Sequence, residues 1–468
     1  MAYRRKRTQG RIVVGTSFLS YVLSGASVQI IGAYMPALSD EFNVGSAVLG
    51  WICSFGYAMM CLAGPVAGVV INKAEPRWVV MTGGLIQASG LILTYLAKTT
   101  TVLYISLGLL PGFGASLVYV SAQISVATYF TSYYSTAIGI VLSGTGVGII
   151  LLSPLIEKLI VVYGWRGAVL IHGALILNVV VMGALLPRHR VQQKIARNTD
   201  MVETKKHKIN QQYHQVSPNT DEGNMKSASK QAEVLESENV ANEITLRNAK
   251  TKWYLAHIQL FTASPIMVLV YLVTFFVNAA YGAAITHMYN QIVLSGYSET
   301  KGALALSLLG VGSLLGRIFH GIPIDAKIML PSTLYMMTLI AAAVMTFVNP
   351  LANNYPGYVV SATGIGFLSG ILFPLLYTII RRNVGTWQLS TAVGLELLVD
   401  GLGIMVGGYI AGAIQQLSGN YSLSFYLVGG IYVLAVCFFL PVFLMERKAK
   451  TWIHVPITTA KTEVGTRV

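Results

Sequence analysis

The sequence predicts an all-α membrane protein whose twelve transmembrane helices form two six-helix bundles. Three observations support this fold class. Of the 468 residues, 54% are hydrophobic and only 11% are charged, with a mean hydropathy of +0.62, which is outside the balance of a soluble domain. Apolar stretches of about 20 residues recur, and each could cross a hydrocarbon core of roughly 30 Å. One long polar break separates six stretches from six.

The apolar stretches have clear approximate limits. We expect helices at 12–34, 47–71, 77–96, 101–124, 134–155, 166–187, 258–284, 303–322, 329–349, 356–380, 388–415 and 422–445. The domain boundaries follow from them. Residues 12–187 form the N-terminal bundle and 255–445 the C-terminal bundle, between tails at 1–11 and 446–468. The break at 188–254 has the polar composition of a disordered linker.

Basic residues indicate how the chain is oriented. They gather in the two tails, the second and tenth connections and the central break, with examples at Arg4, Arg5, Lys6, Arg7, Arg11, Lys73, Arg77, Arg381, Arg382, Arg447, Lys448 and Lys450. Alternating helices place all of these on one side, so both termini and the linker are expected in the cytoplasm. The net charge of +14 is therefore explained by membrane topology, without nucleic-acid binding. We expect a multi-pass protein of the plasma membrane.

Several classes of chemistry are not indicated. Cys53, Cys61 and Cys437 lie in apolar segments, without metal-ligand or disulfide spacing. The sequence has no phosphate-binding loop, metal-ligand cluster or nucleophile elbow. We therefore expect a non-enzymatic secondary carrier that needs no cofactor.

Arg317 is the most informative residue, because it lies inside the apolar run from Leu304 to Ile322. A guanidinium in hydrocarbon costs several kcal/mol, so it needs a polar partner. Two acids of the eleventh segment, Glu396 and Asp400, are four residues apart and share a helix face. At 1.5 Å per residue, Arg317 lies roughly 8 Å from the cytoplasmic edge, Glu396 roughly 12 Å and Asp400 roughly 18 Å.

These three charges allow two interpretations. In the functional one, Arg317 binds a substrate carboxylate in one state and pairs with Glu396 or Asp400 in another. Both acids are candidates for proton coupling, and Asp400, near the midplane, is the better substrate or proton site. The alternative is a fixed ion pair that only holds helices together.

Uncharged polar residues could complete a cavity. In the first half the candidates are Gln29, Tyr34, Tyr57, Gln123, His172 and Asn178, and in the second Asn278, Tyr281, His287 and His320. Each could instead make an ordinary interhelical hydrogen bond, and Tyr34 could anchor the membrane interface.

Loop residues and glycines suggest how such a carrier would move. Asn72, Lys73, Arg77 and Asp325 occupy corresponding connections of the two halves and are expected to form cytoplasmic gates, although positive-inside charge alone would explain Lys73. Glycines recur at close-packing intervals. Clusters in the fifth and eleventh segments favour gating helices over static packing: Gly144, Gly146 and Gly148, and Gly401, Gly403, Gly407 and Gly408.

Three motifs resemble the monocarboxylate transporter family of the major facilitator superfamily. They are GPVAGVVINKAEPRWVVMTGG from Gly64, YGWRGAVLIHGALILN from Tyr163, and the pair Gly316-Arg317. The resemblance covers both halves but not the central loop or tails. It implies the major facilitator fold and alternating access for small organic acids, often with a proton. It also places the family's eighth-helix arginine at Arg317 and its eleventh-helix acid at Asp400.

Departures from the family pattern keep other functions open. Ser313 stands where proton-coupled members have an aspartate, Gln29 stands at the first-helix lysine position, and the acidic signature that opens the first helix is missing. The loss of a fixed positive charge favours a zwitterion or neutral solute over a simple anion. The alternative function is proton-independent, facilitated transport of amino-acid-like, aromatic or zwitterionic solutes. A non-transporting membrane scaffold or sensor is the second alternative, but it has little need of intramembrane charges.

The expected partners are a small organic solute, a proton and the lipid bilayer, and no nucleic acid. A single-pass accessory subunit is a further candidate, as is a scaffold domain that binds the C-terminal residues 466–468. Asn420 begins a glycosylation acceptor pattern on an expected external loop.

Overall fold

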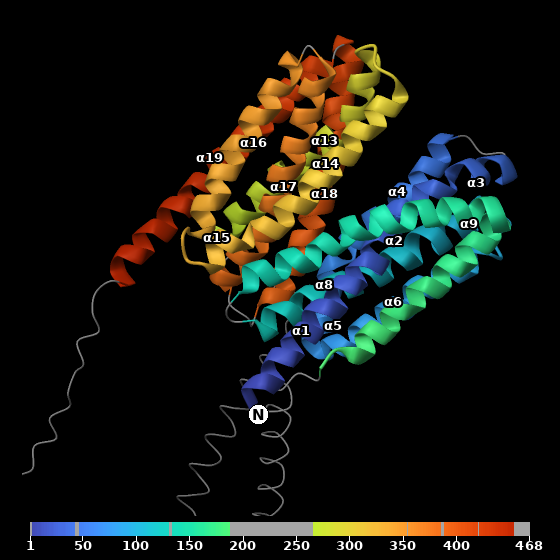
Figure 1. The fold of residues 1–468 in the computed structure, drawn as a ribbon, viewed down its shortest axis with the longest axis horizontal. Helices are drawn as coiled ribbons and strands as arrows, with labels where there is room; N and C mark the ends of the chain where they lie inside the picture. The colour runs from blue at the N-terminus through green and yellow to red at the C-terminus, as the bar shows by residue number, and fades with distance from the viewer. Residues whose placement is uncertain are drawn as a thin grey trace, which may run out of the picture.

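The computed structural model describes most of the chain as helix (Figure 1). The described residues are 2–42, 46–130, 133–187, 265–352, 354–384, 388–419 and 421–453. The expectations for the linker, for Asn420 and for residues 466–468 lie outside these ranges.

The two halves of the chain form separate helical bundles (Figure 1). The N-terminal bundle contains α1 (Ala2–Ser20), η1 (Tyr21–Gly25), α2 (Ala26–Gln29), η2 (Ile30–Tyr34), α3 (Met35–Phe42), α4 (Ser46–Leu62), α5 (Gly64–Lys73), α6 (Pro76–Thr94), α7 (Thr100–Leu103), η3 (Tyr104–Leu109), α8 (Leu110–Tyr129) and α9 (Tyr134–Leu185). The C-terminal bundle contains α13 (Pro265–Leu294), α14 (Glu299–Phe319), α15 (Gly321–Asp325), α16 (Pro331–Val348), η4 (Asn349–Leu351), α17 (Tyr355–Val384), α18 (Leu389–Ser418) and α19 (Tyr421–Ile453).

The expected twelve crossings are confirmed. Within the described ranges nine helices are long and apolar enough to span a membrane, or ten when the bent pair Ser54–Leu62 and Gly64–Lys73 is taken as one span. The long helix α9 supplies two crossings, because Gly164 adopts a φ of +67° and reverses the chain. This conformation suits glycine, which has no Cβ. The helix α6, which has 19 residues but is less apolar than these spans, is the remaining expected crossing.

The outer surface also fits a bilayer. Large apolar side chains are widely exposed, among them Val161, Val360, Met405 and Leu417. Exposure on this scale would be an aggregation hazard in water but is expected where lipid covers the helices. The chain is therefore a multi-pass membrane protein.

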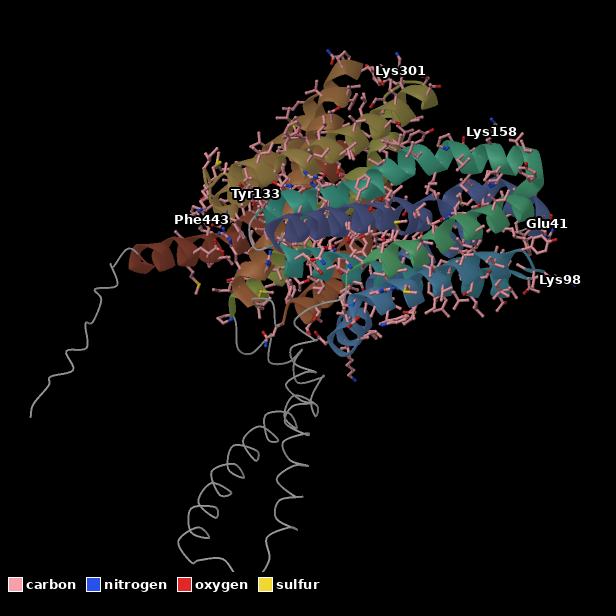
Figure 2. The ribbon with its side chains drawn as sticks, turned by 60° about the horizontal axis from the view of Figure 1, so that its bottom comes forward. Glu41, Lys98, Tyr133, Lys158, Lys301 and Phe443 are labelled. Atoms are coloured by element: carbon pink, nitrogen blue, oxygen red, sulfur yellow. The ribbon has the colours of Figure 1, made fainter. Side chains whose placement is uncertain are left out.

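The bundles meet at one end and diverge at the other (Figure 1). They meet where α5 packs on α18. They also meet where the last turn of α14 and the helix α15 after it pack on α9. We call this the closed end, and the opposite one the open end. Figure 2 shows Tyr133 and Phe443 toward the closed end, whereas Glu41, Lys98 and Lys301 lie toward the open end.

Glycines allow the close approach of the bundles. A methyl group on Gly64 would overlap the carbonyl oxygen of Gly394, and one on Gly68 would overlap that of Ser390. The predicted gating clusters mostly pack inside one bundle instead. Gly144 faces α1, Gly148 faces η1, and Gly403 and Gly407 face α13, each against a backbone carbonyl. For these four the structure supports static packing.

Candidate functional site

A cavity of about 1370 Å³ lies between the two bundles. Its walls come from both halves, including the first helix around Gln29, α4, α8, α9, α13, α14, α17 and α18. Arg317 and Asp400 are its charged lining residues, and Gln29 and Tyr57 line it as well. Four of the predicted binding residues therefore share one cavity.

Arg317 reaches across the cavity to the other bundle. Its Nη1 atom donates a 2.7 Å hydrogen bond to the backbone carbonyl of Leu142 in α9, while its buried Nε has no partner. Behind it, the Nδ1 atom of His320 lies 2.9 Å from the carbonyl oxygen of Arg317. The expected pairing of Arg317 with Glu396 or Asp400 is not present in this conformation. Within the described ranges the ion pair is that of Arg166 and Glu41.

Asp400 and Glu396 occupy different positions relative to the cavity. Asp400 lines it and accepts a hydrogen bond from the side-chain amide of Asn278 in α13. Glu396, one turn earlier, is only 1% exposed and lies next to Tyr377 and Asp400, behind the cavity wall. The two acids therefore lie side by side, and only Asp400 lines the cavity.

Tyr34 and Gln123 do not line the cavity. The hydroxyl of Tyr34 lies 3.3 Å from Nδ1 of His172, whose Nε2 lies 2.9 Å from the hydroxyl of Ser27. The amide of Gln123 donates to the hydroxyl of Tyr21 at 2.9 Å. These groups join helices inside the N-terminal bundle. Tyr34 is also buried, which does not fit an interface anchor.

Of the other predicted polar residues, some line the cavity and others do not. Asn278 and Tyr281 line the cavity. His287 does not line it, and its Nε2 lies 3.0 Å from the carbonyl oxygen of Gly408. Asn178 is exposed and donates to carbonyls of its own helix, so it does not contribute to the site either.

Ser313 contributes to the site although the sequence singled it out only as a departure. It precedes Arg317 by one helical turn, lines the same cavity and is 6% exposed, and its hydroxyl has no hydrogen-bond partner. Spacing of four residues in a helix could have indicated its position. Aromatic residues that complete the wall had no such signal. They are Phe55, Tyr119, Tyr281, Phe373, Tyr377 and Tyr409.

Two of the predicted gate residues close the end of the cavity. Asn72 donates to the hydroxyl of Thr391 at 3.2 Å and accepts a hydrogen bond from Ser390, both in the opposite bundle. On the other side, Oδ2 of Asp325 accepts a 2.8 Å hydrogen bond from the backbone N–H of Thr136 in the first turn of α9. A carboxylate is favourable at a helix N-terminus.

The other two predicted gate residues have no such contact. Lys73 is exposed, and Arg77 lies over the ring of Trp78 in its own bundle, 5.9 Å from the ring centroid. Both still lie at the closed end, beside the contacts that join the two bundles.

The motif from Tyr163 stabilises the open end of the N-terminal bundle. Nη1 of Arg166 lies 2.6 Å from Oε1 of Glu41, and its Nη2 donates to the carbonyl of Ala97 at 3.3 Å. Trp165 donates to Oε2 of Glu41 at 3.3 Å and packs on Phe42, with ring centroids 6.0 Å apart. These contacts tie three connections together and do not reach the cavity.

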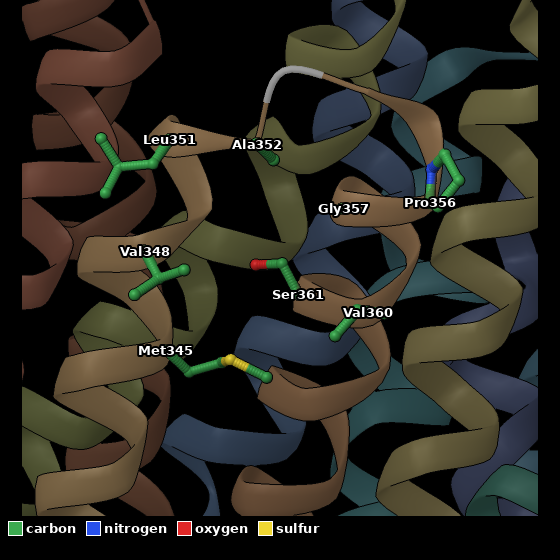
Figure 3. Close-up of a pocket in the computed structure, with 8 residues that line it drawn as sticks. All are labelled: Met345, Val348, Leu351, Ala352, Pro356, Gly357, Val360 and Ser361. Carbon is green, nitrogen blue, oxygen red and sulfur yellow. The ribbon is translucent and has the colours of Figure 1, made fainter.

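A second hollow of about 320 Å³ lies between α16, η4 and α17 (Figure 3). Its walls are apolar apart from Ser361, whose hydroxyl already accepts a 2.8 Å hydrogen bond from Asn349. It has no charged group to orient a solute.

Among the residues that the structure describes, no group of three or more His, Cys, Asp or Glu could hold a metal ion. The central cavity is therefore the candidate site.

Comparisons with known proteins agree with this geometry. The profile of a family described as Major Facilitator Superfamily matches residues 17–350 and 268–465. The chain is 26% identical to "Monocarboxylate transporter 13" of Rattus norvegicus, over 91% of this chain and 87% of that protein. It is 25% identical to "Monocarboxylate transporter 1" of Homo sapiens, over 91% of this chain and 82% of that protein.

Solved structures of this superfamily have the same fold. The proton:xylose symporter XylE superimposes with a TM-score of 0.69 at 13% identity. The match covers 93% of this chain and 96% of the symporter chain. The human organic anion transporter MFSD10 superimposes with a TM-score of 0.65 at 13% identity, over 92% of this chain and 99% of the transporter chain.

Proposed function

Since the chain belongs to the Major Facilitator Superfamily, we propose that it carries small organic solutes bearing a carboxylate across a membrane by alternating access. The observation that carries this proposal is Arg317, a cation placed in a cavity between two bundles that touch at one end only. An intramembrane arginine that faces a cavity is typical of a solute or ion pathway. Its relatives named monocarboxylate transporters support the same class of solute.

Arg317 is the proposed anchor of the carboxylate. Its planar donor fork matches a carboxylate with two parallel hydrogen bonds. In the structure, the carbonyl of Leu142 accepts one of its donors and Nε has no partner. An incoming carboxylate could use Nε at once and take the place of the carbonyl, which loosens one contact between the bundles.

Asp400 is the proposed site of a proton that accompanies a simple acid. A monoanion bound to Arg317 leaves the carboxylate of Asp400, in the same cavity, without a positive partner. Protonation of Asp400 removes its charge, and with it the desolvation cost of an unpaired carboxylate. Glu396, beside Asp400, extends the proton site away from the cavity. A solute that brings its own positive charge would need no such proton.

The proposed orientation places the closed end in the cytoplasm, with both termini, and opens the cavity to the outside of the plasma membrane. The basic residues of the tails and of the closed-end connections support it. Alternating access then requires the contacts of Asn72 and Asp325 to break while the open end closes.

Uptake into liposomes that contain the purified protein tests this function. Labelled lactate, pyruvate, aromatic amino acids and creatine are offered with and without an inward proton gradient, and protein-free liposomes are the control. Saturable uptake of at least one carboxylate-bearing solute is expected. If none of these solutes enters under either condition, the proposed function is wrong and the scaffold or sensor alternative is favoured.

A further inference from the structure

We propose that the preferred solute of this site is an aromatic zwitterion, which is a small molecule with a carboxylate, an ammonium group and an aromatic ring. The inference rests on the proposed transport function and names the substrate class of the same cavity. Three features of the wall support it: a carboxylate-binding pole, an ammonium-binding pole and an aromatic lining.

The carboxylate pole is formed by α14. Arg317 offers an unpartnered Nε, and Ser313, one turn away, offers an unpartnered hydroxyl in the same cavity. A buried donor without a partner is unfavourable, so both groups gain a hydrogen bond when a ligand oxygen reaches them. The serine hydroxyl adds a donor without adding charge, and it does not repel an anion.

The ammonium pole is formed by Asp400 of α18. Asn278 fixes the orientation of its carboxylate, and no basic side chain pairs with it among the described residues. Tyr57 lies close to Asp400 and lines the cavity as well. A carboxylate with an aromatic ring nearby is well suited to an ammonium group, through charge pairing and a cation–π contact.

The balance of charge selects between solute classes. The cavity wall carries one basic side chain, Arg317, and one acidic side chain, Asp400, while Gln29 adds a neutral amide from the first helix. A simple monoanion compensates Arg317 and leaves Asp400 charged and alone, and a simple cation does the reverse. A zwitterion compensates both, which avoids the desolvation cost of an unpaired charge.

The aromatic lining selects for a ring. Phe55, Tyr119, Tyr281 and Phe373 line the cavity, and the rings of Tyr281 and Phe373 already meet edge to face with centroids 5.1 Å apart. Aromatic rings attract further rings in such geometries. At about 1370 Å³ the cavity also exceeds what a three-carbon acid would fill.

Three matched solutes test the substrate class on the unmodified protein. They are phenylalanine, 3-phenylpropanoate, which lacks the ammonium group, and phenethylamine, which lacks the carboxylate. Uptake into liposomes is measured at pH 7.5 without a gradient. We expect kcat/KM for phenylalanine to exceed that for each analogue by at least about tenfold, because each analogue leaves one buried charge unpaired.

Asp400→Asn then identifies the ammonium pole. The variant keeps the shape of the side chain and removes its charge, so uptake of phenylalanine is expected to fall at least about tenfold while uptake of 3-phenylpropanoate is retained or rises. Asp40→Asn, at an exposed site in α3 away from the cavity, is the matched control and should change neither. Monodispersity of each purified variant checks folding.

The outcomes separate the two proposals. If 3-phenylpropanoate enters as well as phenylalanine, or if Asp400→Asn lowers both equally, the zwitterion proposal is overturned while carboxylate transport stands. The comparison of solutes on the unmodified protein decides the matter even where the variant does not fold. If none of the carboxylate-bearing solutes enters, the underlying transport function itself fails.

Discussion

The guanidinium of Arg317 and the backbone carbonyl of Leu142 are joined by a 2.7 Å hydrogen bond that links α14 of one bundle to α9 of the other. A carbonyl oxygen has two lone pairs, so Leu142 can accept this donor as well as its helical partner. The contact holds the arginine over the cavity without a carboxylate. It also makes the position of Arg317 dependent on how close the bundles are.

Replacement of Arg317 by Gln should reduce uptake of every carboxylate-bearing solute by at least about tenfold, because the charge and the donor fork are both lost. Arg317→Lys should restore little of this uptake, since an ammonium group cannot make the two parallel hydrogen bonds. Surface expression should be unchanged. Arg382→Gln, at an exposed closed-end arginine outside the cavity lining, is the control. Normal kinetics of Arg317→Gln would contradict the site assignment.

The fold was predictable because lipid imposes a simple rule. Each backbone segment that crosses a bilayer must satisfy its own hydrogen bonds, so apolar runs of sufficient length become helices. The helix ends were less predictable. The seventh span continues to Leu294, ten residues beyond the expected limit at 284, because interfacial polar residues such as Gln291 are buried by neighbouring helices.

The candidate site was predictable in part. Arg317 and Asp400 stand out because charge is costly in an apolar segment, and both line the cavity. Depth along a helix axis placed Glu396 nearest to Arg317, but depth does not give the direction in which a side chain points. Tyr34 and Gln123 show the same limit, since only packing decides that they face His172 and Tyr21.

A methyl group on Gly68 should prevent full closure of the closed end, because it would overlap the carbonyl oxygen of Ser390. Gly68→Ala should lower uptake and increase thiol labelling of a cysteine placed at Ser135, which lies 3.2 Å from Thr378 of the other bundle. Gly430→Ala in α19, where the added methyl group has open space, is the control. Equal labelling in both variants would show that this glycine does not set the closure.

Uptake of a simple acid should increase as the external pH falls, whereas uptake of a zwitterion should not. In the proposed mechanism a simple acid is carried with a proton on Asp400, which lower pH supplies, while an ammonium group binds the ionised form. Among the described residues, the charged or titratable groups around Asp400 include Glu396, Arg317, Tyr57, Cys61, Tyr119, Tyr335 and Tyr377.

Asp400→Asn tests this pH dependence. With no proton site facing the solute, uptake of 3-phenylpropanoate in this variant should no longer respond to pH between 5.5 and 7.5. The measurement is initial rate against external pH, and the Asp40→Asn protein should keep the response. A response of the same size in the Asp400 variant would assign the proton to another group, with Glu396 as the next to test.

Trp165 should matter more for stability than the ion pair beside it. Its ring is 7% exposed and packs on Phe42, and removal of a buried aromatic ring costs about 3–5 kcal/mol. The partners Arg166 and Glu41 are 38% and 40% exposed, so solvent screens their attraction. Trp165→Ala should therefore lower the apparent melting temperature of the purified protein by several degrees, and Glu41→Gln by much less. A larger loss for Glu41→Gln, removed by high salt, would instead assign the stability of this end to charge.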